Sequence, residues 1–147
     1  MGDSFFRKRY SVETCVFILL AVAIFTIYFQ VIGFDFILYD DPKYVRDNAH
    51  VTQGLTREGV KWAFASLGYA SNWHPLTWLS HMLDAELFGQ DPGMLHLVNV
   101  VFHLLNSCLL FLLFSHLSGD RWKSAAIAGL FAVHPLHVES VAWIAER

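Results

Sequence analysis

The order of apolar and polar positions divides the chain into three apolar segments with polar stretches between them. Residues 15–34 contain no Asp, Glu, Lys or Arg, and neither do residues 93–119 or 124–138. A helix that crosses a bilayer needs ~20 mainly apolar residues. The first two segments reach that length, and the third reaches it if its helix continues past Glu139. The pattern predicts an all-α membrane protein with three transmembrane helices, at residues 15–34, 93–117 and 124–140.

The first apolar segment is predicted to stay in the protein as a span. Arg7, Lys8 and Arg9 precede it, as basic residues precede the core of a signal peptide. However, its apolar stretch exceeds the ~7–15 residues of a signal core, and no small-x-small cleavage site follows it. The composition agrees with a membrane protein, since 55% of residues are hydrophobic and 16% are charged, against ~25% charged in soluble domains.

Basic residues orient these spans, because loops on the cytoplasmic side carry an excess of Lys and Arg. The rule places residues 1–14 and the loop 118–123 in the cytoplasm. The long segment 35–92 has four basic and eight acidic residues and is placed on the extracytoplasmic side. Residues 141–147 then begin a second external loop, and the chain is expected to be truncated there.

The external segment is predicted to contain two amphipathic helices that lie at the outer membrane interface. One follows Thr56 as N-cap, and the other covers residues 75–88. In the second helix leucines recur at helical spacing, while His81 and Asp84 lie off the leucine stripe. Indole suits an interface that is wet on one side and apolar on the other, and three tryptophans lie here: Trp62, Trp73 and Trp78. The alternative is an ordinary extracytoplasmic loop.

A stripe of polar residues runs along one face of the second predicted span. Spacings of three, four and three place His96, Asn99, His103 and Asn106 on one helix face. Polar groups that face lipid are costly, so this stripe is predicted to face a bundle interior or a water-filled cavity. Two interpretations remain open, hydrogen bonding between helices and contact with substrate. Small residues of the third span allow close helix packing, at Ala125, Ala126, Ala128, Gly129 and Ala132.

The acidic pair Asp40-Asp41 directly follows the first span and is a candidate for acid–base chemistry. Adjacent carboxylates repel, and in a partly desolvated site this repulsion tunes one of them to act as a general base on a hydroxyl. The alternative is a solvated turn before Pro42.

A second candidate site lies where Pro135 interrupts the third apolar segment and frees backbone groups. His137 and Glu139 are candidates to bind a metal, a phosphate or one another, and a phosphate-facing His with an orienting Glu is the favoured interpretation. Two ligands two positions apart fall short of a metal site, so no metal is assigned, although a divalent metal stays possible. His74 precedes the helix at 75–88 and either contacts a lipid phosphate or caps that helix.

The remaining composition excludes some classes of function. The net charge of −3 argues against nucleic acid as a partner, which needs a basic surface. Cys15 and Cys108 lie in apolar segments and form no disulfide framework. A metal transporter that uses the eight histidines is disfavoured, because no intramembrane cluster of carboxylates accompanies them.

Six motifs occur in a fixed order after Phe34. They are Asp40-Asp41-Pro-Lys-Tyr-Val, Asn48, Gln53-Gly-Leu-Thr56, Asn72-Trp-His-Pro-Leu-Thr-Trp-Leu-Ser-His81, Leu97-Val-Asn99 with His103, and Phe131-Ala-Val-His-Pro-Leu-His-Val-Glu-Ser-Val-Ala-Trp-Ile-Ala-Glu-Arg147. Together they resemble the N-terminal part of membrane-embedded GT-C glycosyltransferases of the protein O-mannosyltransferase-like type that carry C-terminal tetratricopeptide repeats. No 34-residue helical repeat is visible in this sequence.

The resemblance implies an enzyme that moves a sugar from a polyprenyl-phosphate donor in the bilayer to a protein hydroxyl, with inversion at the anomeric carbon. It makes Asp40 or Asp41 the candidate base, and it gives His137 and Glu139 a role in placing donor phosphate or acceptor. Arg147 becomes a candidate phosphate contact, since a guanidinium suits phosphate oxygens. This chain alone is expected to be inactive. The alternative is a non-catalytic multi-pass membrane subunit or sensor.

Overall fold

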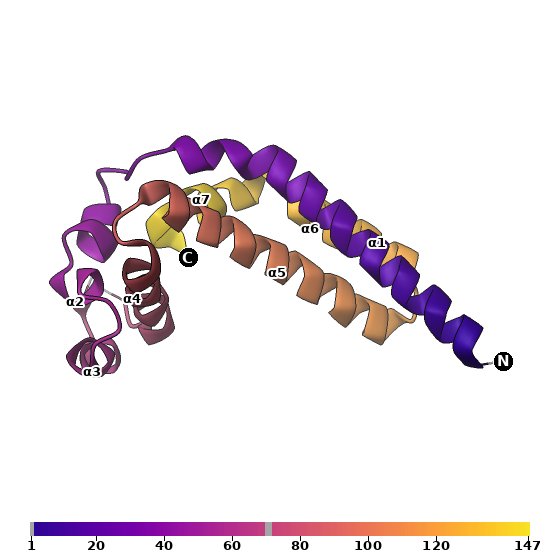
Figure 1. The fold of residues 1–147 in the computed structure, drawn as a ribbon, viewed down its shortest axis with the longest axis horizontal. Coiled ribbons are helices and arrows are strands. Elements are labelled where there is room, and N and C mark those ends of the chain that lie inside the picture. Colours follow the sequence, from indigo (N-terminus) through magenta and orange to yellow (C-terminus); the bar gives the residue numbers. More distant parts are fainter. Residues whose placement is uncertain (1, 70–71) are drawn as a thin grey trace. The chain divides into compact units, whose positions relative to one another are not determined.

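The computed structural model describes the backbone of residues 2–69 and 72–147, and the side chains of residues 12–69 and 72–147. This part of the chain is helical, and no strand forms within it, so the predicted all-α class is confirmed. The longer helices (Figure 1) are α1 (Gly2–Tyr28), α3 (Arg57–Ala65), α4 (Pro75–Phe88), α5 (Pro92–Ser118) and α6 (Arg121–Val133). The shorter ones are α2 (Ala49–Thr52), α7 (Val138–Ala142), a π-helical turn (Pro42–Arg46) and 3-10 turns (Phe29–Gly33, Pro135–His137, Ile144–Glu146).

Two helical segments are long and apolar enough to cross a membrane, Val12–Gly33 and Pro92–Ser118. A third span exists if Arg121–Val133 and Pro135–Ala142 count as one segment with a bend of 51°. The bend falls where the sequence predicts a break, because Pro135 has no N–H and His134 before it takes an extended conformation (φ −70°, ψ 129°). The structure thus supports two spans, and three if a broken helix is counted.

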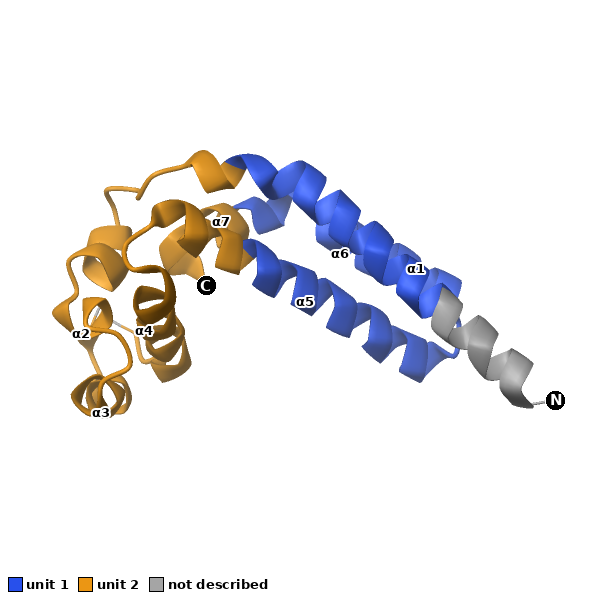
Figure 2. Cartoon of the chain, in the orientation of Figure 1, with its two compact units in different colours: residues 1–30, 100–138 blue, residues 31–99, 139–147 orange. Residues whose placement is uncertain are grey.

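The described chain divides into two compact units (Figure 2). Unit 1 comprises residues 1–30 and 100–138, and unit 2 comprises residues 31–99 and 139–147. In unit 1 the helices α1 and α6 run side by side (Figure 1). One face of α1 is buried at every fourth residue, at Val16, Leu20, Ile24 and Tyr28. Of the small residues predicted to permit close packing of α6, Ala128 and Ala132 are fully buried.

The core of unit 2 is built from aromatic side chains of short helices. Trp78 of α4 is fully buried, with its ring stacked on Tyr44 at 4.9 Å between centroids and Trp62 edge-on at 5.2 Å. The predicted interfacial position of Trp78 is therefore wrong, because its indole fills the core among neighbouring rings. Trp73, by contrast, is exposed. The predicted N-cap is confirmed, since Thr56 Oγ1 accepts the N–H of Gly59 at 2.9 Å.

Helix α4 begins and ends at the predicted residues, and its buried face mixes apolar and polar side chains. Leu76, Leu83 and Leu87 are exposed, whereas His81 and Asp84 are buried. A soluble helix turns leucines inward and charges outward. Trp78 and Met82 are buried together with His81 and Asp84, so it is the outward leucines alone that fit an apolar surrounding.

A glycine permits close contact between two segments of unit 2. A Cβ placed on Gly93, at the start of α5, would lie 2.6 Å from the carbonyl oxygen of Ile32 and 3.2 Å from Asp91 Oδ1. Real Cβ atoms essentially never approach a backbone oxygen that closely. Only glycine therefore lets α5 begin this close to the end of the first candidate span.

Candidate functional site at the acidic loop

The two adjacent acids of the acidic loop occupy different environments. Asp41 is fully buried, and both carboxylate oxygens accept backbone N–H groups. Its Oδ2 accepts from Ile37 at 2.8 Å and its Oδ1 accepts from Ala145 at 3.0 Å. Asp40 is half-buried, and its carboxylate makes no hydrogen bond within the described part of the chain. The backbone carbonyl of Asp40 accepts the N–H of Tyr44 at 2.8 Å, which fixes the turn.

Arg147 lies inside unit 2 and is held by several partners. Its Nε donates to Asn99 Oδ1 at 2.7 Å, and its Nη1 donates to Ser80 Oγ at 2.8 Å and to the Asp84 carboxylate. Nη2 donates to the carbonyl of Leu95 at 3.2 Å. Burial lowers the pKa of Arg147 and raises the pKa of Asp84, and the charge of each opposes the shift of the other. In this arrangement the guanidinium binds the protein's own groups, so contact with a phosphate stays a prediction.

His74 occupies the N-cap position of α4 without capping it, so the capping interpretation is wrong. Its ring packs against Tyr44 at 5.4 Å and Trp78 at 5.0 Å instead. The Nε2 atom is buried and has no hydrogen-bond partner in the described chain. Burial lowers the pKa of His74, and the nearby Glu146 opposes this shift. Because Nε2 is buried, the structure shows no surface of that atom open to a phosphate, and the predicted phosphate contact stays untested.

His137 and Glu139 lie at the helix break, one in each unit. The ring of His137 packs in unit 1 against Phe131 at 4.2 Å and His103 at 5.4 Å. Glu139 is exposed in unit 2, and its backbone carbonyl accepts the N–H of Trp143 at 3.1 Å. Among the described residues no group of three or more His, Cys, Asp or Glu side chains is placed to hold a metal ion.

The polar stripe of α5 is buried over three of its four predicted positions. His96, Asn99 and His103 are buried, whereas Asn106 is exposed. Within unit 2, Asn99 Nδ2 donates to the carbonyl of Trp143 at 2.9 Å. Within unit 1, His103 Nε2 lies 3.0 Å from the carbonyl of Ala132. Asn99 and His103 therefore form hydrogen bonds between segments, as the helix-packing interpretation expects.

Several residues that the structure places in the site were not assigned to it from the sequence. Ser80, Asp84 and Leu95 surround Arg147, and His81 is fully buried with neither ring nitrogen hydrogen-bonded in the described chain. Burial holds the pKa of His81 well below its usual value, and the charge of Arg147 lowers it further. A signal was present, because Asp84 sits in a leucine-rich helix and a buried acid requires a cationic partner.

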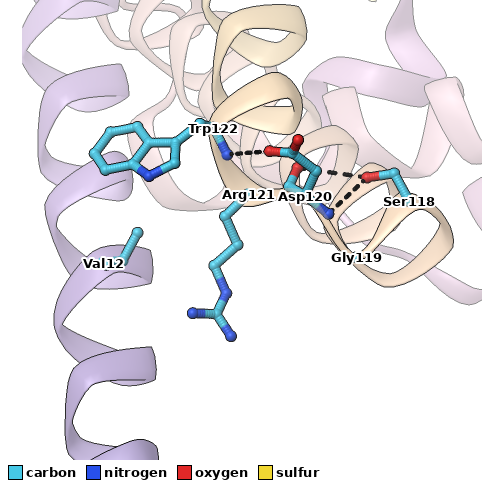
Figure 3. A pocket seen from close by; sticks show the side chains of 6 residues that line it. All are labelled: Val12, Ser118, Gly119, Asp120, Arg121 and Trp122. Atoms are coloured by element: carbon cyan, nitrogen blue, oxygen red, sulfur yellow. Dashed lines mark hydrogen bonds between the residues drawn. The ribbon is translucent and has the colours of Figure 1, made fainter.

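A separate hollow of about 550 Å³ lies in unit 1, at the turn between α5 and α6 (Figure 3). Gly119 takes a positive φ of 69° there, and Asp120 caps α6 by accepting the N–H groups of Trp122 and Lys123 at 3.1 Å each. Figure 3 shows Val12 of α1 beside Arg121 and Trp122. This turn is the loop predicted to be cytoplasmic.

The long apolar helices define an all-helical membrane protein. Comparison with known proteins confirms the O-mannosyltransferase part of the resemblance drawn from the motifs, whereas the tetratricopeptide repeats are not tested. The chain is 34% identical to protein O-mannosyl-transferase Tmtc1 of Drosophila melanogaster over 130 aligned residues. This aligned region covers 84% of the chain and 15% of Tmtc1. It is 30% identical to protein O-mannosyl-transferase Tmtc2 of the same organism over 141 aligned residues. That aligned region covers 91% of the chain and 15% of Tmtc2.

A third relative is protein O-mannosyl-transferase TMTC3 of Mus musculus, 40% identical over 76 residues, or 52% of the chain and 8% of that protein. The chain thus spans 15% or less of the length of these three curated relatives. No family model matches the chain. No solved structure matches it either.

Proposed function

We propose that the chain is the N-terminal portion of an integral-membrane glycosyltransferase. The enzyme moves a sugar, mannose by analogy with its relatives, from a polyprenyl-phosphate donor to a Ser or Thr hydroxyl of a protein. The observation that carries the proposal is the similarity over 84% of the chain to a protein O-mannosyl-transferase, together with an acid left open in the acidic loop. Transfer takes place on the extracytoplasmic side, where the charge pattern puts residues 35–92.

In this proposal Asp40 removes the proton from the acceptor hydroxyl. A general base must reach the hydroxyl and must have a free lone pair. The Asp40 carboxylate supports this assignment, since it is only half-buried and makes no hydrogen bond in the described chain. The hydroxyl oxygen then attacks the anomeric carbon of the sugar, the bond from that carbon to the phosphate oxygen breaks, and the polyprenyl phosphate leaves with the bonding electron pair.

Four residues are proposed to place the donor phosphate or the acceptor: His74, His137, Glu139 and Arg147. His74 Nε2 is buried without a hydrogen-bond partner in the described chain, so its ring would have to turn outward to meet a phosphate. Arg147 would have to exchange a bond to Ser80 or Leu95 for a phosphate oxygen, because those partners occupy it in this structure. A divalent metal is not assigned, since the described acids and histidines do not gather in threes.

The helices α3 and α4 are proposed to lie at the outer membrane interface. Only three residues, 89–91, separate α4 from α5, which is a candidate span. Four Cα–Cα steps of at most ~3.6 Å keep the end of α4 within ~14 Å of that span. The outward leucines of α4 then face acyl chains, and the exposed Trp73 lies at headgroup level.

The test uses the full-length protein in nanodiscs, with polyprenyl-phosphate mannose as donor and a Ser/Thr peptide as acceptor. Asp40→Asn is expected to lower kcat by about 100-fold or more, because loss of a general base typically costs ~10²–10⁴-fold. The matched control is Asp47→Asn, which removes an exposed acid bound only to Arg46 among the described side chains and leaves turnover unchanged. Wild-type turnover in Asp40→Asn would contradict the assignment.

The second candidate is a non-catalytic membrane subunit, and the polar stripe favours it. The side chains of Asn99 and His103 form hydrogen bonds with backbone carbonyls, as expected of residues that only join helices. This candidate predicts that His103→Leu impairs assembly while Asp40→Asn has no phenotype. The paired variants therefore separate the two functions.

A further inference from the structure

The segment Trp143–Arg147, here called the clasp segment, is bound to unit 2 at both ends. At its start, Asn99 Nδ2 donates to the carbonyl of Trp143 at 2.9 Å. At its end, Thr77 Oγ1 donates to the carbonyl of Arg147 at 3.4 Å, and the guanidinium binds groups of α4 and α5, including Asp84. In its middle, Ile144 and Ala145 are buried in the aromatic core.

Asp41 joins the clasp segment to the acidic loop. Its carboxylate accepts the N–H of Ala145, 104 positions away, and the N–H of Ile37 within the loop. The side chain is fully buried, so water does not replace either bond. A buried N–H that loses its acceptor bears the full cost of desolvation, and a carboxylate is a stronger acceptor than a neutral group.

The two acids are therefore specialised by their surroundings. Each Asp41 oxygen already holds a backbone N–H, whereas the Asp40 carboxylate holds none in the described chain. The neighbouring Tyr39 also rests on the clasp segment, with its ring 5.9 Å from that of Trp143. The residues directly before and after Asp40, Tyr39 and Asp41, therefore both contact the clasp segment.

We infer that Asp41 is a positioning residue, which fixes the acidic loop on the clasp segment through Ala145 and so sets the direction of the Asp40 carboxylate. Arg147, bound to Asp84 and Ser80, anchors the far end of the same segment. The catalytic part of this inference rests on the proposed function, whereas the anchoring part does not. Misplacement of a reacting group by ~1 Å can cost ~10²-fold in rate, so such an anchor affects turnover without touching substrate.

The anchoring is tested by backbone hydrogen exchange on the full-length protein in nanodiscs, with peptides that cover Ile37 and Ala145. Asp41→Ala is expected to speed exchange at both amides by about tenfold or more, since their acceptor is removed. Asp41→Asn keeps one acceptor oxygen, and its amide nitrogen cannot accept. Exchange at one of the two amides should then stay slow. Unchanged exchange in Asp41→Ala would overturn the inference.

The positioning role is tested by transfer kinetics on the same proteins. Asp41→Ala is expected to lower kcat by about 100-fold and Asp41→Asn by about tenfold, with KM for donor little changed. The acidic limb of the pH–rate profile should persist in Asp41→Asn and disappear in Asp40→Asn, which separates a positioning residue from the general base. Loss of that limb in Asp41→Asn would make Asp41 the base and overturn the inference. A wild-type protein without transfer would defeat the proposed function, while the exchange experiment still decides the anchoring.

Discussion

The two units differ in how they use polar side chains. Among the described side chains of unit 1 the buried polar residues are His103, Ser107 and Ser124, and they bind backbone carbonyls, as His103 does at Ala132 and Ser107 does at His103. In unit 2 the buried polar groups include charges, Asp41, Asp84 and Arg147, and they join segments far apart in sequence. Unit 1 is thus held by apolar helix packing with polar supplements, whereas the shape of unit 2 depends on a few charged anchors.

The largest effect is expected from breaking the charged anchor of unit 2. Arg147→Met leaves the Asp84 carboxylate buried without its cation, which should cost about 3–5 kcal/mol in the free energy of unfolding. The measurement is urea-dependent pulse proteolysis of the full-length protein, with cleavage sites read in residues 31–99. Adding Asp84→Leu should recover most of the loss, since a buried pair can be replaced by apolar groups. A double variant as unstable as the single one would contradict this explanation.

A smaller effect is expected where unit 2 relies on close backbone contact. Gly93→Ala puts a Cβ 2.6 Å from the carbonyl of Ile32, so the start of α5 must shift. Overpacking of this kind costs about 1–3 kcal/mol, and the same proteolysis assay measures it. Gly129→Ala is the matched control in unit 1, because no atom lies within 4 Å of its built Cβ and alanine favours helix. Equal effects of the two substitutions would refute the close-contact explanation.

The stability of unit 2 is also expected to fall in acid because of His81. The folded protein holds the pKa of His81 well below the unfolded value of 6.5, so below that pH the unfolded state binds a proton that the folded state does not. The contribution is present above pH 6.5 and is lost as pH falls, by about 1.4 kcal/mol per pH unit until the folded pKa is reached. Denaturation at a series of pH values from 7.5 to 5.5 measures the slope. His81→Phe should flatten it, although His74, whose pKa is also lowered, retains part of it. An unchanged slope in His81→Phe would exclude His81 as its source.

The smallest effect is expected in unit 1. His103→Leu removes the hydrogen bond to Ala132 and supplies an apolar side chain in its place. Hydrogen bonds between membrane helices average about 0.6 kcal/mol and reach about 1.7 kcal/mol, so the loss should stay in that range. Steric trapping or reversible unfolding in detergent measures it. A loss as large as that of Arg147→Met would show that the two units do not differ in the way described.

Local features of the fold were predictable because their causes lie within a few residues. The bounds of α4 follow from Pro75 at its first turn and Gly89 after its last residue, which has a positive φ of 66°. The cap at Thr56 and the break at Pro135 are local in the same way. The wrong assignments concern direction, because periodicity does not say which neighbours a face meets. Trp78 was placed at the membrane interface and lies in the core.

The sequence by itself determined the longer helices, the cap at Thr56, the apolar segments and the resemblance to O-mannosyltransferases, since each depends on residue type and short-range spacing. Only the tertiary structure decided that Asp41 binds Ala145, that Arg147 pairs with Asp84, and that the Asp40 carboxylate makes no hydrogen bond to the described residues. Two adjacent aspartates are equivalent in a sequence. They become different when folding removes one from water and supplies backbone N–H groups to both of its oxygens, and such long-range partners leave no local pattern to detect.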